Sequence, residues 1–195
     1  MLSRWPFRPA RRSRLAAFVT ALLAVAVASP RAEGPPPFRS LKEIRERGVV
    51  IQQWESSCAA AAVATVLTYG FDDPVSERTA AARMLEHTDP RKVKARGGFS
   101  LLDLQTFVVS RGYLGNAYKH LGFDDLQVFH APIVPIVQHG YFHYVVFNGV
   151  ADGRVLLADP AFGNRTVTRA RFESMWLKGM AFVVTRPGAG HAKAE

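Results

Sequence analysis

The stretch IQQWESSCAAAAVATVLTYG, residues 51–70, places the chain's only cysteine at the start of an alanine-rich apolar run. A single thiol cannot form a disulfide within the chain, so Cys58 is either a small buried residue or a reactive group. The residues after it favour a largely buried helix that begins near Cys58 and ends at Gly70, with Ser56 or Ser57 to cap its start. Because the N–H groups and dipole of a helix N-terminus favour negative charge, this position would stabilise a thiolate.

Outside this stretch, helical patterns come first along the chain and extended patterns afterwards. The second half holds short β-branched or aromatic runs separated by Gly, Pro and Asp. This order predicts an α+β domain, in which N-terminal helices, with the nucleophile at a helix start, pack on a C-terminal antiparallel sheet. The expected helices cover residues 41–47, 75–86, 101–111 and 171–177, the expected strands cover residues 133–138, 142–150, 155–158, 165–168 and 181–185, and a charged loop is expected at residues 87–98.

The first 28 residues have the features of a secretory signal peptide. Residues 1–14 carry five arginines and no acidic residue, and an uncharged run then ends in an A-x-A site at positions 26–28. The run is shorter than the roughly 20 residues that span a bilayer, so it favours a cleaved signal over the alternative, a membrane anchor. We predict cleavage near Ser29 and a periplasmic product with no stable membrane anchor.

The domain organisation predicted on this basis is a signal peptide at 1–28, a proline-rich linker at 29–39, one domain at 40–186 and a disordered tail at 187–195. Without the five arginines of the signal, the formal net charge falls from +9 to +4. No basic stripe is interleaved with aromatic residues, so we expect no nucleic-acid partner. The chain has no HExxH or CxxC motif, so we expect no metal and no cofactor.

A nucleophilic cysteine needs a base, and His143 is the candidate among six histidines. It lies within the strand pattern YFHYVVFNGV, alternating with Val145 and Phe147, where burial would fix its orientation. The alternative is a core histidine whose hydrogen bonds are satisfied. Asp159 ends the next strand pattern, RVLLADP, and can orient the imidazole. Its alternative is an ordinary turn residue before Pro160.

Two glutamines, Gln52 and Gln53, precede the cysteine by six and five residues. A side-chain amide here could donate to a developing oxyanion together with the backbone N–H of Cys58. A glutamine in such an approach segment carries little information by itself.

The combination of these residues resembles peptidase family C39, which comprises papain-like cysteine peptidases known for cutting bacteriocin leader peptides after a double glycine. The resemblance rests on a Gln six residues before a helix-opening Cys, a strand His much later, and Asp-Pro sixteen residues after that His. It runs from about residue 41 to 184. The resemblance implies that Cys58 is the nucleophile, His143 the base, Asp159 the orienting acid and Gln52 the oxyanion donor.

Three stretches, QQWESSCAAAAVATVLTYG, GGFSLLDLQ and DGRVLLADPAFGNRTVTRARFESMW, are similar to the stand-alone exported C39 peptidases of the Fap functional amyloid system. That likeness implies a periplasmic role in amyloid secretion and assembly, with a protein or peptide of that system as substrate. Ala59 stands where relatives often have glycine, and Ser57 where exporter domains often have aspartate. The alanine could narrow the surroundings of the nucleophile, and the serine weakens any transfer of double-glycine specificity.

We therefore expect an exported cysteine peptidase, a thiol protease that hydrolyses peptide bonds in a secreted client protein. One alternative is a papain-like binding module that holds an amyloid client without cutting it. Another is a cell-wall amidase or acyltransferase, since the same Cys-His order recurs in such enzymes. The Gly97-Gly98 pair is interpreted as a flexible loop before a helix cap at Ser100, with a self-processing site as the alternative.

Overall fold

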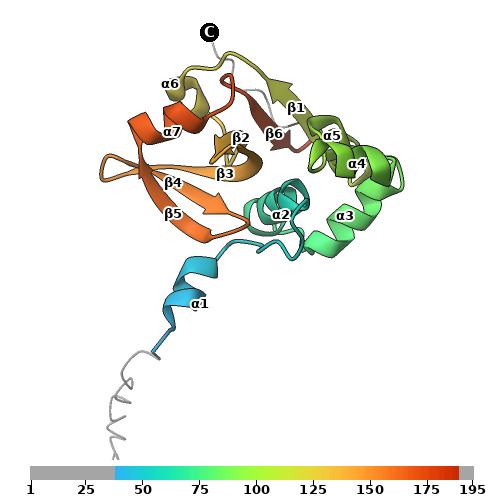
Figure 1. Cartoon of the computed structure of the whole chain (residues 1–195), viewed down its shortest axis with the longest axis horizontal. Helices are drawn as coiled ribbons and strands as arrows, with labels where there is room; N and C mark the ends of the chain where they lie inside the picture. The colour runs from blue at the N-terminus through green and yellow to red at the C-terminus, as the bar shows by residue number, and fades with distance from the viewer. Residues whose placement is uncertain (1–37, 189–195) are drawn as a thin grey trace, which may run out of the picture. The chain divides into compact units, whose positions relative to one another are not determined.

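A six-stranded antiparallel sheet with helices on both faces organises residues 38–188, the part of the chain that this computed structural model describes (Figure 1). The predicted signal peptide, most of the predicted linker and residues 189–195 of the predicted tail lie outside the described residues. The strands follow the spatial order β1-β6-β2-β3-β4-β5. They are β1 (Leu114–Tyr118), β2 (Ile133–Gln138), β3 (Tyr141–Ala151), β4 (Arg154–Asp159), β5 (Gly163–Thr168) and β6 (Ala181–Thr185).

Most of the described helices begin where the sequence supplies a capping side chain. Ser40 and Ser100 each form a capping box with the acidic residue three positions later. The helical segments are α1 (Leu41–Glu46), α2 (Cys58–Thr65), the π-helical turn η1 (Val66–Gly70), α3 (Glu77–Leu85), α4 (Pro90–Arg96), α5 (Leu101–Ser110), α6 (Phe123–Leu126) and α7 (Arg169–Met175). The predicted helix that starts at Cys58 is therefore present, and its last turn is a π-helix.

Side chains that alternate along the strands fill two separate cores. One face of the sheet packs against α2, α3 and α5, using residues such as Tyr144 and Val146 of β3. The opposite face packs against α6 and α7, using Val145 and Phe147 of the same strand. Figure 1 shows α2 between the sheet and the helices α3 to α5. The fold is thus α+β, with helices packed on an antiparallel sheet, as the sequence predicted.

Two-residue turns set the register of the central hairpins. His139 and Gly140 join β2 to β3, and Asp152 and Gly153 join β3 to β4, all four with positive φ. Such turns match the right-handed twist of the strands. The first of them fixes where β3 begins, and hence where His143 lies at the end of the sheet.

The structure corrects the predicted charged loop at residues 87–98, which contains the helix α4. Asp89 caps it by accepting a hydrogen bond from the Arg91 N–H at 2.8 Å, Pro90 is its first residue and Gly97 ends it in the left-handed conformation. These start and stop signals are present in the sequence. Only one apolar side chain of the helix, Val93, is buried, so no amphipathic pattern marks it.

Two further elements, β1 and α6, were not predicted. β1 reads LGNAY and contains no β-branched residue, although it pairs along its whole length with β6. A side chain at Gly115 would place its Cβ 2.6 Å from Phe182 and 2.7 Å from Val108, so close packing against α5 and β6 requires the glycine.

Over the described residues, no helix has both the length and the apolar character needed to cross a membrane.

Candidate active site

Cys58 is the first residue of α2 and is only 4% exposed. The predicted serine cap is absent: Ser57 occupies the N-cap position, but its side chain makes no capping hydrogen bond. Its hydroxyl instead donates to the Glu77 carboxylate, the stronger of two nearby acceptors, and the Trp54 carbonyl oxygen lies 2.7 Å from it. The helix N-terminus at Cys58 therefore keeps N–H groups that no side-chain cap occupies.

His143 and Asp159 come together across β3 and β4. The His143 Nε2 atom lies 2.8 Å from Asp159 Oδ1, and Asp159 is fully buried. A carboxylate only accepts hydrogen bonds, so Nε2 carries the proton and donates it. The other ring nitrogen, Nδ1, remains for a second partner. Asp159 Oδ1 also accepts a hydrogen bond from the Ala161 N–H at 2.9 Å, which fixes the carboxylate.

A third charged residue at this pair, Arg165, was missed at the sequence level. Its guanidinium lies 2.7 Å from Asp159 Oδ2, an ion pair without the angles of a hydrogen bond, and donates to Gln138 Oε1 at 3.0 Å. Arg165 lies on β5 opposite Leu157, diagonal to Asp159 on β4. It was predicted as a strand residue, and only the register of β4 with β5 reveals its partner.

The charges at this pair explain its ionisation. Burial alone would lower the pKa of His143, but hydrogen bonds and charge from Asp159 and from Cys58 raise it to about 9. Burial would raise the pKa of Asp159, but His143, Arg165 and the Ala161 N–H hold it below its ordinary value. The site thus favours an imidazolium and a carboxylate at neutral pH, with Cys58 next to the imidazolium.

Gln52 approaches the site from the segment before α2. Its backbone N–H donates to the Pro160 carbonyl at 2.8 Å, next to Asp159, and its side-chain Nε2 donates to the Trp54 carbonyl at 3.0 Å. Because a carbonyl oxygen only accepts, this contact identifies the nitrogen end of the amide and leaves one of its two N–H groups for another acceptor. The Oε1 atom is buried and has no hydrogen-bond partner among residues 38–188.

A groove of about 1480 Å³ contains both Gln52 and His143 in its lining. Exposed aromatic side chains rim it: Trp54, Tyr141, Phe142 and Phe162. A smaller cavity of about 220 Å³ reaches Cys58 and Tyr144, and the two share Arg96, Gly97, Phe99 and Phe142 in their walls. Burial and the nearby Cys58 raise the pKa of Tyr144, so its hydroxyl stays protonated. The adjoining cavities bring Gln52, Cys58 and His143 to one region of the surface, while Asp159 is buried and contacts this region through its hydrogen bond with His143.

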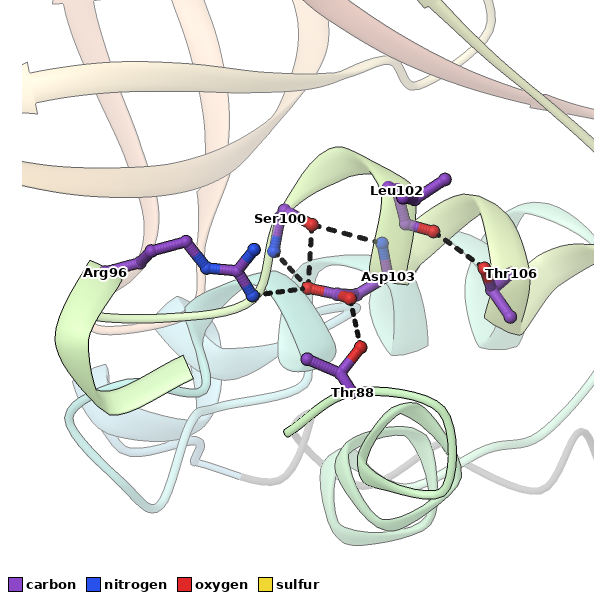
Figure 2. A network of polar contacts seen from close by, with 6 residues as sticks. All are labelled: Thr88, Arg96, Ser100, Leu102, Asp103 and Thr106. Atoms are coloured by element: carbon purple, nitrogen blue, oxygen red, sulfur yellow. Dashed lines mark hydrogen bonds and ion pairs between the residues drawn. The ribbon is translucent and has the colours of Figure 1, made fainter. Parts of the chain in front are cut away.

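A buried aspartate fixes the wall that the two cavities share (Figure 2). Asp103 of α5 accepts hydrogen bonds from the Ser100 N–H at 2.6 Å and the Ser100 hydroxyl at 2.8 Å, and pairs with Arg96 at 3.1 Å. The Thr88 hydroxyl also donates to it. Figure 2 shows Arg96, Ser100 and Thr88 converging on this one carboxylate. The Gly97-Gly98 pair, which was predicted to be a flexible loop, therefore lies between two residues that Asp103 holds, Arg96 and Ser100.

Metal ligation finds no support in the described part of the chain. Between residues 38 and 188 no three His, Cys, Asp or Glu side chains gather into a group that could hold an ion.

The cysteine at a helix start, the His143–Asp159 pair on the sheet and the α+β architecture together define a papain-like fold. Solved structures share this fold. The peptidase domain of Streptococcus ComA, a bi-functional ABC transporter involved in a quorum sensing pathway, matches with a TM-score of 0.59 at 19% identity, over 71% of this chain and 97% of that domain. A double glycine motif protease from an AMS/PCAT transporter, in complex with the leader peptide, gives 0.57 at 20% identity, over 70% and 89%.

The chain belongs to the peptidase C39 family, whose model matches residues 46–188. It is 35% identical over 162 residues to a Pseudomonas fluorescens protein named probable functional amyloid protease FapD, covering 81% of this chain and 70% of that relative. The Pseudomonas aeruginosa protein of the same name is 32% identical over 155 residues, covering 77% and 67%. The resemblance drawn from the sequence is thereby confirmed at the level of the family and of these relatives.

Proposed function

We propose that this chain is an exported cysteine peptidase that hydrolyses peptide bonds in a secreted client of a functional amyloid system. The observation that carries the proposal is the 2.8 Å hydrogen bond between His143 Nε2 and the buried Asp159 carboxylate, beside a cysteine at a helix start. The names of the two Pseudomonas relatives support the amyloid client.

In the first step, His143 takes the proton of the Cys58 thiol at Nδ1, since Nε2 is already protonated and engaged with Asp159. The raised pKa of His143 favours the resulting imidazolium near neutral pH. The thiolate gains further stabilisation from the N-terminus of α2. Asp159 keeps the ring in one tautomer and one orientation throughout.

The thiolate then attacks the carbonyl carbon of the substrate, and the carbonyl oxygen becomes an oxyanion. The free N–H of the Gln52 amide and the backbone N–H of Cys58 are the donors proposed to stabilise it. The Trp54 carbonyl holds the Gln52 amide by its other N–H, so the donor is oriented before substrate arrives.

Collapse of the tetrahedral intermediate breaks the peptide C–N bond, and His143 Nδ1 gives its proton to the leaving amine. Water, deprotonated by the neutral imidazole, then attacks the thioester and releases the new carboxylate together with Cys58. Every proton in this cycle moves through His143 Nδ1, so the proposed chemistry needs no further acid or base.

The periplasm is the proposed site of action, on the basis of the basic start, apolar run and A-x-A site in residues 1–28. Mass spectrometry of periplasmic and secreted proteins tests client cleavage, comparing cells that carry the wild-type chain with cells that carry Cys58→Ala. New N-termini in an amyloid-system protein, present only with the wild type, are the expected result. Identical peptide maps with both chains bound equally to the client would establish the non-cleaving binding module instead.

A further inference from the structure

Glu77 is a buried acid that the proposed mechanism does not use. It is the first residue of α3 and is 4% exposed, although no ion pair within residues 38–188 involves it. An unpaired buried carboxylate is costly unless hydrogen bonds satisfy it. Its side chain therefore has a structural or functional task that compensates for its burial.

The hydrogen bonds of Glu77 go to the segment that joins Gln52 to Cys58. Its Oε1 atom accepts from the Gln53 N–H at 2.8 Å and contacts the Ser57 hydroxyl. Gln53 directly follows Gln52, the proposed oxyanion donor, and Ser57 directly precedes Cys58, the proposed nucleophile. One carboxylate oxygen thus holds both ends of the loop, from a different helix and 20 or more positions along the chain.

The same loop orients the Gln52 amide. The Trp54 carbonyl, inside the loop, accepts from Gln52 Nε2 at 3.0 Å and from the Ser57 N–H at 3.3 Å, and the Ser57 hydroxyl oxygen lies 2.7 Å from it. Movement of the loop would therefore move the Gln52 amide relative to the N-terminus of α2. Among the side-chain hydrogen bonds of residues 53–57 within the described part of the chain, those to Glu77 are the ones that reach beyond residues 51–57.

We propose that Glu77 is a positioning residue for the oxyanion donors: it ties Gln53 and Ser57 to α3 and so holds the Gln52 amide in register with the Cys58 N–H. This inference rests on the proposed peptidase chemistry. It assigns Glu77 an effect on reactions that pass through an oxyanion and none on reactions that need only the thiolate.

Ser57 is the residue type this contact requires. A hydroxyl can lie against a carboxylate, whereas an aspartate at position 57 would bring a second negative charge to the same buried oxygen. Ser57→Asp should therefore reproduce the defect of losing Glu77, and the double variant Ser57→Asp with Glu77→Ser should recover part of the loss.

Two small probes separate the two kinds of reaction without knowledge of the natural substrate. p-Nitrophenyl acetate acylates Cys58: the thiolate attacks the ester carbonyl through an oxyanion, and p-nitrophenolate leaves as the S-acetyl bond forms. Iodoacetamide alkylates Cys58 by direct displacement of iodide, with no oxyanion. Cys58 is the chain's only cysteine, so the Cys58→Ala protein supplies the background for both.

The decisive variants are Glu77→Leu and Glu77→Gln, which have similar volumes and differ in the acceptor oxygen. We expect Glu77→Leu to slow acylation by roughly 10- to 100-fold, as a misplaced donor does, and to leave alkylation within about twofold. Glu77→Gln retains an acceptor oxygen and should react like the wild type. Glu86→Ala, which removes an exposed carboxylate that pairs with Arg83 just after the same helix, is the matched control.

The double variant Gln52→Ala with Glu77→Leu provides the sharpest outcome. If Glu77 acts through Gln52, the double variant acylates no more slowly than Gln52→Ala alone; effects that multiply would overturn the proposal. Unchanged acylation in Glu77→Leu, or an equal fall in alkylation, would also overturn it. Should Glu77→Leu fail to fold, Ser57→Ala in the same cycle applies the same criteria. A wild-type protein that acylates no faster than Cys58→Ala would refute the peptidase chemistry itself.

Discussion

The helical side of the groove brings Gln52 and Cys58 from a single seven-residue segment, whereas the sheet side brings His143, Asp159 and Arg165 from three strands. The helical side holds its loop with hydrogen bonds from backbone N–H groups and a hydroxyl. The sheet side holds its pair with buried charges. The difference indicates a division of labour. The local segment presents the nucleophile and a neutral donor, and the tertiary structure sets the ionisation of both.

Removal of the base should have the largest effect, and a change on the sheet side should alter the reactivity of Cys58 on the helical side. His143→Ala deprives Cys58 of the imidazolium, so we expect hydrolysis to fall on the order of 10⁴-fold or more. Alkylation by iodoacetamide near neutral pH should fall as well, because the thiolate loses its partner. Rates of alkylation measured on the two folded proteins test this, and equal rates would make Cys58 a structural residue.

Loss of the neutral donor should damage only one kind of reaction. Gln52→Ala removes the proposed oxyanion contact, and we expect peptide hydrolysis to slow by roughly 10²–10³-fold with iodoacetamide alkylation unchanged. Parallel rate measurements on the same preparation check the split. A parallel loss of both reactions would show that Gln52 acts by packing. The burial of its Oε1 atom is consistent with such a role.

The pH dependence should report the charge on the sheet side. Because the pKa of His143 is raised to about 9, kcat/KM should hold up to that pH and then fall by about tenfold for each further unit as the imidazolium is lost. Asp159→Asn removes a hydrogen bond and a charge that raise this pKa, so the alkaline limb should move to lower pH. A limb that stays in place in Asp159→Asn would assign it to another group.

The same shift carries a consequence for stability. A histidine whose folded pKa lies above its ordinary value of 6.5 stabilises the fold fully below that value, and the contribution disappears as pH rises through about 9. Equilibrium unfolding at pH 6 and pH 10 should therefore differ more in the wild type than in His143→Ala.

Local signals predicted most of what lies on the helical side. The helix at Cys58 and the capping boxes at Ser40 and Ser100 depend on neighbouring residues alone, and all three are present. The role of Ser57 could not be predicted in the same way. A helix-capping serine and a serine hydrogen-bonded to a distant acid look alike in sequence, and the contact with Glu77 exists only once α3 packs against α2.

On the sheet side, residue type and spacing predicted the His143–Asp159 pair but not its third member. The strands β4 and β5 were expected, but nothing in the sequence specifies which residue of β5 lies diagonal to Asp159. A one-residue change of register would point Arg165 to the opposite face. The Arg165 side chain is also only 21% exposed, whereas arginine side chains are mostly exposed in folded proteins.

Arg165→Met should have the smallest effect on rate and the clearest effect on acid stability. His143 and the Ala161 N–H still hold Asp159 Oδ1, so catalysis should retain most of its rate. The guanidinium, however, helps to lower the pKa of the buried Asp159. A carboxylate with a lowered folded pKa stabilises the fold above its unfolded pKa, and the contribution is lost as pH falls through the folded value. Without Arg165 the folded pKa of Asp159 rises, so acid unfolding followed by circular dichroism should begin at a higher pH than in the wild type.

Arg154→Met is the control, because Arg154 lies on neighbouring β4 and is bonded to Thr166 at the surface. An unchanged acid transition in Arg165→Met would mean that His143 and the Ala161 N–H set the ionisation of Asp159 without help from Arg165.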